Sequence, residues 1–182
     1  PSVRMFQGDI TFKDIYSQVI EAAKEEKCDF LLATPPCQGM SKAGLKKKAD
    51  PRNSLILVVI NAIKDLLPKF AIIENVPEII WAKIEYEGEL VKIGDLIEKE
   101  LGDKYTFNKQ KIVNAMNYGI AQSRERCVFL LSRKDTKVNW EFPEADERIL
   151  TMRDAIGDLP SLDPFVTDIT EDQRKELFPD FD

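Results

Sequence analysis

The chain has 182 residues, 26 of them basic and 32 acidic, and with a net charge of −6 and 43% apolar residues it suits a single domain with its own core. Its longest apolar run, Leu55 to Ile60, is far shorter than the roughly 18 residues that span a bilayer, so we expect no membrane partner. Histidine is absent, which excludes Ser-His-Asp and Cys-His catalysis and histidine-bound zinc, and we expect no metal.

Strand and helix patterns alternate along the chain. The expected elements are, in order, a strand at 3–7, a helix capped by Thr11, a strand at 29–33, a helix at 55–67, a strand at 70–73, a loop at 81–89, a helix at 90–101, strands at 105–113 and 127–131, and a helix at 152–159. The run at 29–33 is nearly all apolar, as in a strand buried on both faces. Residues 168–182 are acidic and predict a solvated stretch without a core.

This order predicts an α/β fold with a mostly parallel sheet covered on both faces, to which the last two strands add an antiparallel extension. Ligands bind such sheets at the carboxyl ends of the strands. The expected strands end close to Asp9, Pro36–Cys37 and Glu74, so we expect these side chains to converge at one edge. Arg124 and Arg126, at the start of the last strand, are expected to face the same edge.

The three cysteines are an odd number at wide spacing, which predicts neither a disulfide framework nor a metal site and favours a reduced, cytoplasmic setting. Cys28 and Cys127 lie beside or within apolar strands and are interpreted as small buried side chains. Cys37 follows two prolines at a strand end, where a rigid turn would hold its thiol in a cleft. It is the candidate nucleophile.

The segment TPPCQGMS at 34–41 resembles the catalytic signature of the C5-cytosine methyltransferases. Further segments resemble that family in the correct order: GDIT at 8–11, DPRNSL at 50–55, ENVP at 74–77, YGIAQSRER at 118–126 and TMRDAIGDLP at 151–160. The resemblance implies a Rossmann-like, S-adenosylmethionine-dependent methyltransferase fold. It also implies a DNA (cytosine-5-)-methyltransferase, expected in a bacterial restriction-modification or DNA-methylation system.

The resemblance also implies roles for single residues. A thiolate at Cys37 would attack C6 of cytosine, which turns the ring into an enamine that accepts a methyl group at C5. Glu74 would protonate or hydrogen-bond N3 and accept from the 4-amino group, and Arg124 or Arg126 would hold O2. In the cofactor site, Asp9 would accept from the adenine amino group of S-adenosylmethionine. The side chains expected to line that site are Ile10, Pro36 and Leu55.

Double-stranded DNA is the expected partner, which places the protein at the nucleoid if it is bacterial. Because C6 cannot be reached inside a duplex, the target cytosine must be extruded. The segment after Cys37 carries a net charge of +4 over residues 42–52, as expected for a loop that follows phosphates. The candidate DNA contacts are Gln38, Ser41, Lys42, Lys46, Lys47 and Arg52.

Two parts of the family pattern are not found in the sequence: the opening Phe-x-Gly-x-Gly turn, and the target-recognition domain with the motifs that follow it. We therefore expect residues 1–163 to form a partial catalytic domain, incomplete at the N-terminus, and residues 164–182 to form an acidic linker toward a target-recognition domain. The expected further partner is the remainder of the enzyme or a complementing subunit. A fragment, a processed product and one part of a split enzyme all fit this expectation.

Two alternatives stay open: a tRNA cytosine-5 methyltransferase of the same family, which shares the Pro-Pro-Cys-Gln core, and a non-catalytic fragment that only binds nucleic acid or a partner. A zinc cytosine deaminase is excluded because the chain has no histidine and no Pro-Cys-x-x-Cys segment. A Rossmann dehydrogenase is excluded because no Gly-x-Gly fingerprint is present.

Overall fold

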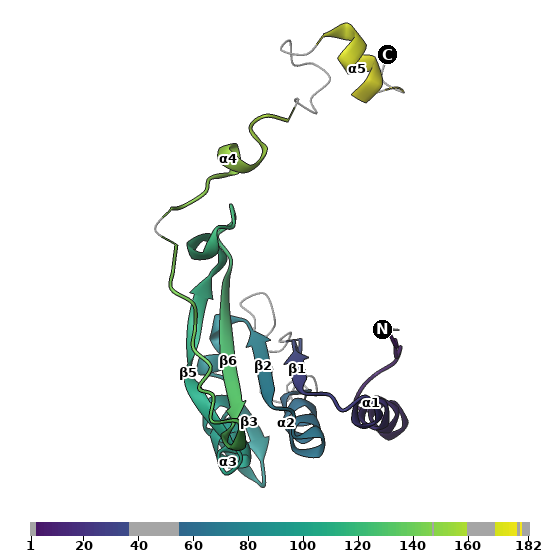
Figure 1. Cartoon of the computed structure of the whole chain (residues 1–182), viewed down its shortest axis with the longest axis vertical. Coiled ribbons are helices and arrows are strands. Elements are labelled where there is room, and N and C mark those ends of the chain that lie inside the picture. The colour runs from purple at the N-terminus through teal and green to yellow at the C-terminus, as the bar shows by residue number, and fades with distance from the viewer. Residues whose placement is uncertain (1–2, 37–54, 147, 160–169, 178, 180–182) are drawn as a thin grey trace. The chain divides into compact units, whose positions relative to one another are not determined.

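The structure is a computed structural model that describes residues 3–36, 55–146, 148–159, 170–177 and 179 (Figure 1). It contains a four-stranded sheet. The chain divides into two units, one made of residues 1–114 and 124–144 and the other of residues 115–123 and 145–182. The sheet and the helices that pack on it belong to the first unit.

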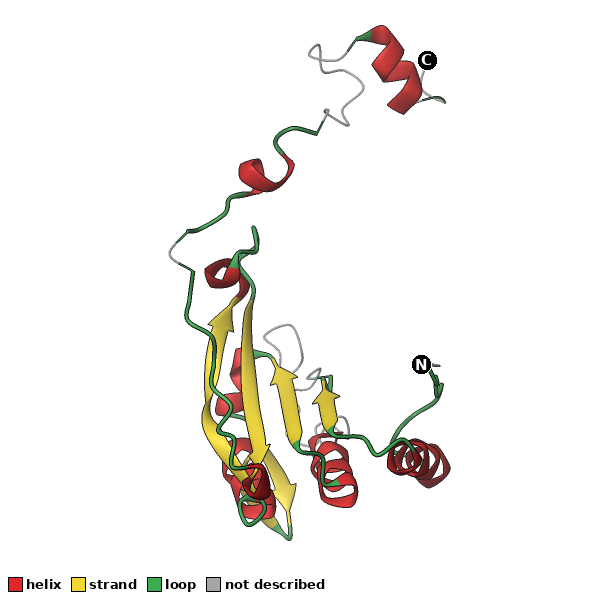
Figure 2. Cartoon of the chain, in the orientation of Figure 1, coloured by secondary structure: helices red, strands yellow, loops and turns green. Residues whose placement is uncertain are grey.

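The sheet has the order β1-β2-β6-β5 and combines parallel and antiparallel pairs (Figure 2). Its strands are β1 (Phe30–Ala33), β2 (Phe70–Asn75), β5 (Tyr105–Asn114) and β6 (Glu125–Arg133). β1 pairs with β2 in parallel, and β6 runs antiparallel to both of its neighbours, β2 and β5. Three of the four strands therefore share one direction, and the expected antiparallel pairing of the last two strands is confirmed.

The core lies between one face of the sheet and two helices, α2 (Leu55–Leu66) and α3 (Ile93–Leu101). Their buried side chains, among them Ile63 and Leu96, cluster with alternate residues of the strands such as Ile73 and Leu131, each of them fully buried. The nearly continuous apolar run that begins at Leu55 explains why α2 packs so deeply. Ile56, Ile60 and Ile63 recur at helical spacing and face the sheet.

The opposite face of the sheet has a different cover from the one expected. Phe30 and Phe70, neighbours on β1 and β2, lie against the ring of Trp140, with ring centroids 5.9 and 5.5 Å apart in edge-on arrangements. Trp140 belongs to the chain that follows β6 and is not part of a helix. Within the described residues, helices thus pack on one face, and the expectation of helices on both faces is not met.

The expected strand at 3–7 is wrong. Val3 and Met5 are 91% and 88% exposed, and no strand lies beside this segment within the described residues. A strand needs a neighbour to pair with its backbone. The segment is instead held by Arg4, which forms ion pairs with Glu25 and Glu26 at 2.8 and 3.1 Å.

The first helix, α1 (Lys13–Glu25), begins after Phe12, and Thr11 does not cap it. The hydroxyl of Thr11 donates to the Asp9 carboxylate at 2.8 Å and is therefore committed to the preceding turn. The expectation that β1 is buried on both faces is also wrong, because β1 ends the sheet order and Leu32 is 60% exposed.

A hairpin formed by β3 (Lys83–Tyr86) and β4 (Glu89–Lys92) replaces the loop expected at 81–89. Its turn residues, Glu87 and Gly88, have φ of 53° and 81°, which is the combination that two-residue hairpin turns require. Glutamate rarely adopts this conformation, so the sequence does not signal the turn. The helix predicted from residue 90 begins at Ile93 because Leu90 lies in β4.

The second unit contains two short α-helices in its described residues. α4 (Met152–Ile156) starts at Thr151, whose side chain and that of Asp154 form a reciprocal capping box, which confirms the predicted cap. α5 (Glu171–Leu177) was not expected in the acidic stretch, and its start is stabilised by the Thr170 hydroxyl, which accepts from Gln173 N at 3.2 Å. None of the helices in the described part of the chain has the length and apolar character needed to cross a membrane.

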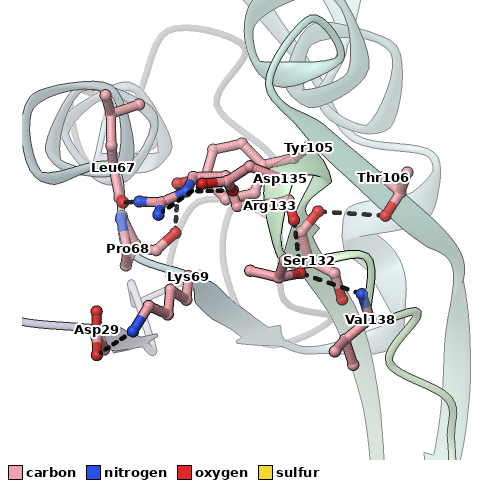
Figure 3. A network of polar contacts seen from close by, with 11 residues as sticks. Asp29, Leu67, Pro68, Lys69, Tyr105, Thr106, Ser132, Arg133, Asp135 and Val138 are labelled. Carbon is pink, nitrogen blue, oxygen red and sulfur yellow. Dashed lines mark hydrogen bonds and ion pairs between the residues drawn. The ribbon is translucent and has the colours of Figure 1, made fainter.

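Polar contacts hold the sheet at the end where β1 and β2 begin (Figure 3). The Tyr105 hydroxyl donates to the carbonyl of Pro68 at 2.7 Å, in a fully buried position. Arg133 donates to the carbonyl of Leu67 and pairs with Asp135 at 2.7 Å. These contacts connect the end of α2 to the two antiparallel strands.

Tyr105→Phe is expected to lower the free energy of unfolding by about 1–3 kcal/mol, because the buried Pro68 carbonyl loses its donor. Burial raises the pKa of Tyr105 from its ordinary value of 10.0 to about 12. The wild-type protein should therefore lose this stability as pH rises from 10 toward 12, whereas the Tyr105→Phe variant should not. Urea unfolding at pH 7 and across that range measures both effects, and equal unfolding midpoints for the two proteins at pH 7 would contradict the assignment.

Candidate active site

A cavity of about 380 Å³ opens at the carboxyl end of β1. It lies among α1, α2 and β1, and its lining is almost entirely apolar. Three of the four predicted cofactor residues, Ile10, Pro36 and Leu55, line it although they come from separate parts of the chain.

The fourth predicted cofactor residue, Asp9, precedes Ile10 in an exposed turn and is not among the lining residues. One oxygen of its carboxylate accepts from the backbone N–H and the hydroxyl of Thr11, at 2.9 and 2.8 Å. These hydrogen bonds, the backbone one above all, lower the pKa of Asp9. The carboxylate is therefore ionised at neutral pH and stays an acceptor.

Glu74 and Arg126 form an ion pair at the same edge of the sheet. Arg126 Nε lies 2.7 Å from Glu74 Oε1, and the two side chains are 26% and 29% exposed. Glu74 is the penultimate residue of β2, and Arg126 is the second residue of β6. Because β6 runs antiparallel to β2, its start lies beside the carboxyl end of β2, and the two side chains meet there.

Arg124 lies just before β6, and its side chain is exposed. Its backbone N–H donates to Asn114 Oδ1 at 3.0 Å, which ties the start of β6 to the end of β5. Of the two predicted arginines, Arg126 is thus the one that contacts Glu74.

The predicted nucleophile and the predicted DNA contacts lie outside the described residues, since they fall between Pro36 and Leu55. These residues are Cys37, Gln38, Ser41, Lys42, Lys46, Lys47 and Arg52. The other two cysteines fit their interpretation as structural side chains. Cys127 is fully buried, which raises its pKa to about 12 and keeps it a thiol, and the half-buried Cys28 thiol donates to the Phe30 carbonyl at 2.9 Å.

Sequence reasoning missed Asn75. It ends β2 with only 5% of its surface exposed, and its side chain contacts the carbonyl of Pro35 at 3.0 Å. The signal in the sequence is a polar residue at a position where strand alternation, after Ala71 and Ile73, places a side chain in the core.

Cysteine, aspartate and glutamate residues do not gather in groups of three or more that could hold a metal ion anywhere in the described ranges. Among the described residues, this edge holds the apolar cavity and the Glu74–Arg126 ion pair, and Pro36 directly precedes Cys37 in the sequence.

Comparison with known proteins gives consistent results. The family model for C-5 cytosine-specific DNA methylases matches residues 4–180. The Type II methyltransferase M1.HgaI of Avibacterium volantium is 37% identical over 168 residues, which are 90% of this chain and 46% of that protein. M.FnuDI of Fusobacterium nucleatum is 37% identical over 153 residues, with 81% of this chain and 43% of that protein covered.

A solved structure named as a DNA modification methyltransferase encoded within an E. coli prophage superimposes with a TM-score of 0.64 at 25% identity, over 85% of this chain and 42% of that one. The chain thus spans less than half the length of each of these three proteins. The shared fold is that of the S-adenosylmethionine-dependent methyltransferases. On the family model and these relatives, the chain belongs to the C-5 cytosine-specific DNA methylase family.

Proposed function

We propose that this chain carries the catalytic centre of a DNA (cytosine-5-)-methyltransferase of a bacterial restriction-modification system. The observation that carries the proposal is the Glu74–Arg126 ion pair at the edge of the sheet where β1 leads into Cys37. A carboxyl group and a guanidinium at this place provide the donors and acceptors that a cytosine ring needs along its N3 and O2 edge.

Cys37 supplies the nucleophile. Its thiolate forms a bond to C6 of a cytosine extruded from the duplex, and the electron pair of the C5–C6 double bond becomes available at C5. Glu74 donates a proton or a hydrogen bond to N3, which limits the charge that develops on the ring. After C5 has been methylated, its proton is lost to a base and the C6–sulfur bond breaks, which restores the thiolate.

Arg126 holds the base by its O2 atom while it contacts Glu74. The guanidinium has five N–H donors. The ion pair with Glu74 uses Nε, and Nη1 donates to the Glu125 carbonyl at 2.6 Å, which leaves the remaining N–H groups for the base. Because about a quarter of each side chain is exposed, a base can reach the pair from solvent.

The apolar cavity is the proposed cofactor site. Its volume of about 380 Å³ lies within the roughly 300–1,000 Å³ typical of small-ligand sites. Ile10, Pro36 and Leu55 would hold the adenine ring by apolar contact, and the ionised Asp9 would accept from the adenine amino group. When bound, S-adenosylmethionine supplies the electrophilic methyl group.

Val58→Phe is expected to raise the dissociation constant for S-adenosylmethionine by roughly tenfold or more, because added bulk in a cavity costs about 1–3 kcal/mol. Val58 lies on α2 and lines the cavity. Titration calorimetry measures the change, with Asn61→Phe at an exposed position of the same helix as the control. Equal affinities of the Val58→Phe variant and the wild type for S-adenosylmethionine would show that the cofactor does not bind in this cavity.

Double-stranded DNA is the proposed substrate, and the basic segment 42–52 is proposed to follow its phosphates. The test uses the active enzyme, meaning this chain together with any further polypeptide that activity requires. Methyl-labelled S-adenosylmethionine is supplied with unmethylated duplex DNA or with unmethylated tRNA, and the modified nucleoside is identified. Label in 5-methyldeoxycytidine supports the proposal. Label only in tRNA, or in neither substrate, contradicts it.

A further inference from the structure

The hydrogen-bond ladder between β1 and β2 ends at Ala33, and one residue separates it from the Pro35–Pro36 segment. The two strands pair in parallel from Phe30↔Phe70 to Ala33↔Ile73. Beyond Ala33 the chain continues through Pro35 and Pro36, which have no N–H to donate and which end the regular pairing. The backbone ladder therefore does not hold this segment against β2.

The side chain of Asn75 makes the missing connection. Its Nδ2 donates to the carbonyl of Pro35 at 3.0 Å, and its Oδ1 accepts from the backbone N–H of Val76 at 2.9 Å. The amide thus bonds at once to the Pro35–Pro36 segment after β1 and to the first residue after β2.

Burial makes this connection rigid. Asn75 is 5% exposed, and among the described residues it is one of two buried polar side chains, with Ser132, apart from the buried hydroxyl of Tyr105. A buried amide without partners is costly, so the conformation that satisfies both of its ends is strongly preferred. Asn75 lies on the core side of β2, and by strand alternation Glu74 lies on the other side, where it meets Arg126.

We propose that Asn75 is a positioning residue, whose buried carboxamide replaces the absent ladder hydrogen bond and fixes the Pro35–Pro36 segment, and with it the backbone that enters Cys37, against Glu74. Proline rings fix φ at both positions, so an anchored Pro35 carbonyl also places Pro36. Pro36 lines the proposed cofactor cavity and is followed directly by Cys37. This inference rests on the proposed function.

Asn75→Asp is the most direct test, because it keeps the size and the acceptor for Val76 N–H but removes the donor to Pro35. The expected result is a methyl-transfer rate per folded molecule lowered by roughly 10–100-fold, the scale of a small misplacement of reacting groups. Affinity for duplex DNA should stay within about twofold, because Asn75 is buried and contacts no substrate.

Ser132→Ala is the matched control. It removes a second buried polar side chain, whose hydroxyl accepts from the backbone N–H of Trp140 at 3.1 Å at the opposite end of the sheet. It should lower thermal stability and leave the rate constant unchanged, which separates a positioning role from loss of stability. If the Asn75→Asp variant does not fold, Asn75→Ser, which is too short to reach Pro35, gives the same comparison.

The assay is single-turnover formation of a covalent complex between the active enzyme, supplied with S-adenosylmethionine, and a duplex amplified with 5-fluorodeoxycytidine triphosphate. Slow complex formation in the Asn75 variant, with wild-type rates in Ser132→Ala, supports the positioning role. Equal rates in the Asn75 variant and the wild type overturn it while the proposed function stands. If the wild type itself forms no complex, the covalent mechanism is what fails, and with it this inference.

Discussion

Cys37→Ala in the active enzyme is expected to lower the rate of methyl transfer to DNA by at least roughly 10⁴-fold, the scale on which removal of a covalent nucleophile acts. Without addition at C6, C5 of cytosine remains a poor nucleophile. S-adenosylmethionine should still bind, because its proposed cavity is lined by other residues, among them Ile10 and Leu55. Label transfer measures the rate, and calorimetry measures cofactor binding.

The matched controls are the other two cysteines. Cys127 is fully buried, and burial raises its pKa to about 12. The Cys28 thiol donates to a backbone carbonyl. Neither thiol is therefore placed to act as the nucleophile toward cytosine. Cys28→Ser should leave turnover near the wild-type rate. Turnover of Cys37→Ala at the wild-type rate would end the assignment of Cys37 as the nucleophile.

The second large effect is expected at Glu74. Glu74→Gln keeps the shape and one hydrogen bond but cannot release or take up a proton, so the rate should fall by roughly 10²–10⁴-fold, as for loss of a general acid. The substitution also removes the charge that faces Arg126 at 2.7 Å. Single-turnover kinetics at saturating DNA measure the chemical step apart from binding.

Glu78→Gln is the control for this charge change. Glu78 lies four residues further along, in the short 3₁₀ helix η2 (Pro77–Ile80), and none of the described ion pairs includes it. Glu78 is half-buried, and the substitution should leave the rate within about twofold of the wild type because it breaks no described ion pair. A Glu74→Gln rate as high as that of the control would make Glu74 a structural residue.

The sequence predicted those helices and strands in which apolar residues recur regularly and a residue such as proline marks the end of the element. The helix from Leu55 and the strand from Phe70 follow this rule, because Pro68 separates two apolar runs of different length. The capping box at Thr151 was predicted for a similar reason, since its bonds form between residues three apart. Local patterns succeed where local contacts decide the structure.

The failures have more than one cause: a contact with a distant segment in one case, and weak local signals in the other two. Residues 3–7 have strand-like composition, but composition does not say whether another strand lies beside them, and within the described residues none does. The β3–β4 hairpin depends on left-handed conformations at Glu87 and Gly88, which no strong turn signal announces. For α5, a cap at Thr170 outweighs an acidic composition.

In the candidate site, too, some contacts were predicted from the sequence and others were not. Motif order placed Glu74 and Arg126 at one edge of the sheet, and the antiparallel start of β6 brings them to 2.7 Å. The role of Asn75 depends on a bond to Pro35, forty residues earlier in the chain, which no local pattern contains.

The most direct test of the covalent mechanism is to map the trapped complex. The active enzyme is incubated with S-adenosylmethionine and duplex DNA that carries 5-fluorocytosine, in which fluorine cannot leave C5 as a proton does. The complex is then digested and its peptides are sequenced by mass spectrometry. We expect one modified peptide, with the nucleotide on Cys37. A modified Cys28 or Cys127, or methyl transfer to ordinary DNA without any trapped complex, would contradict the account.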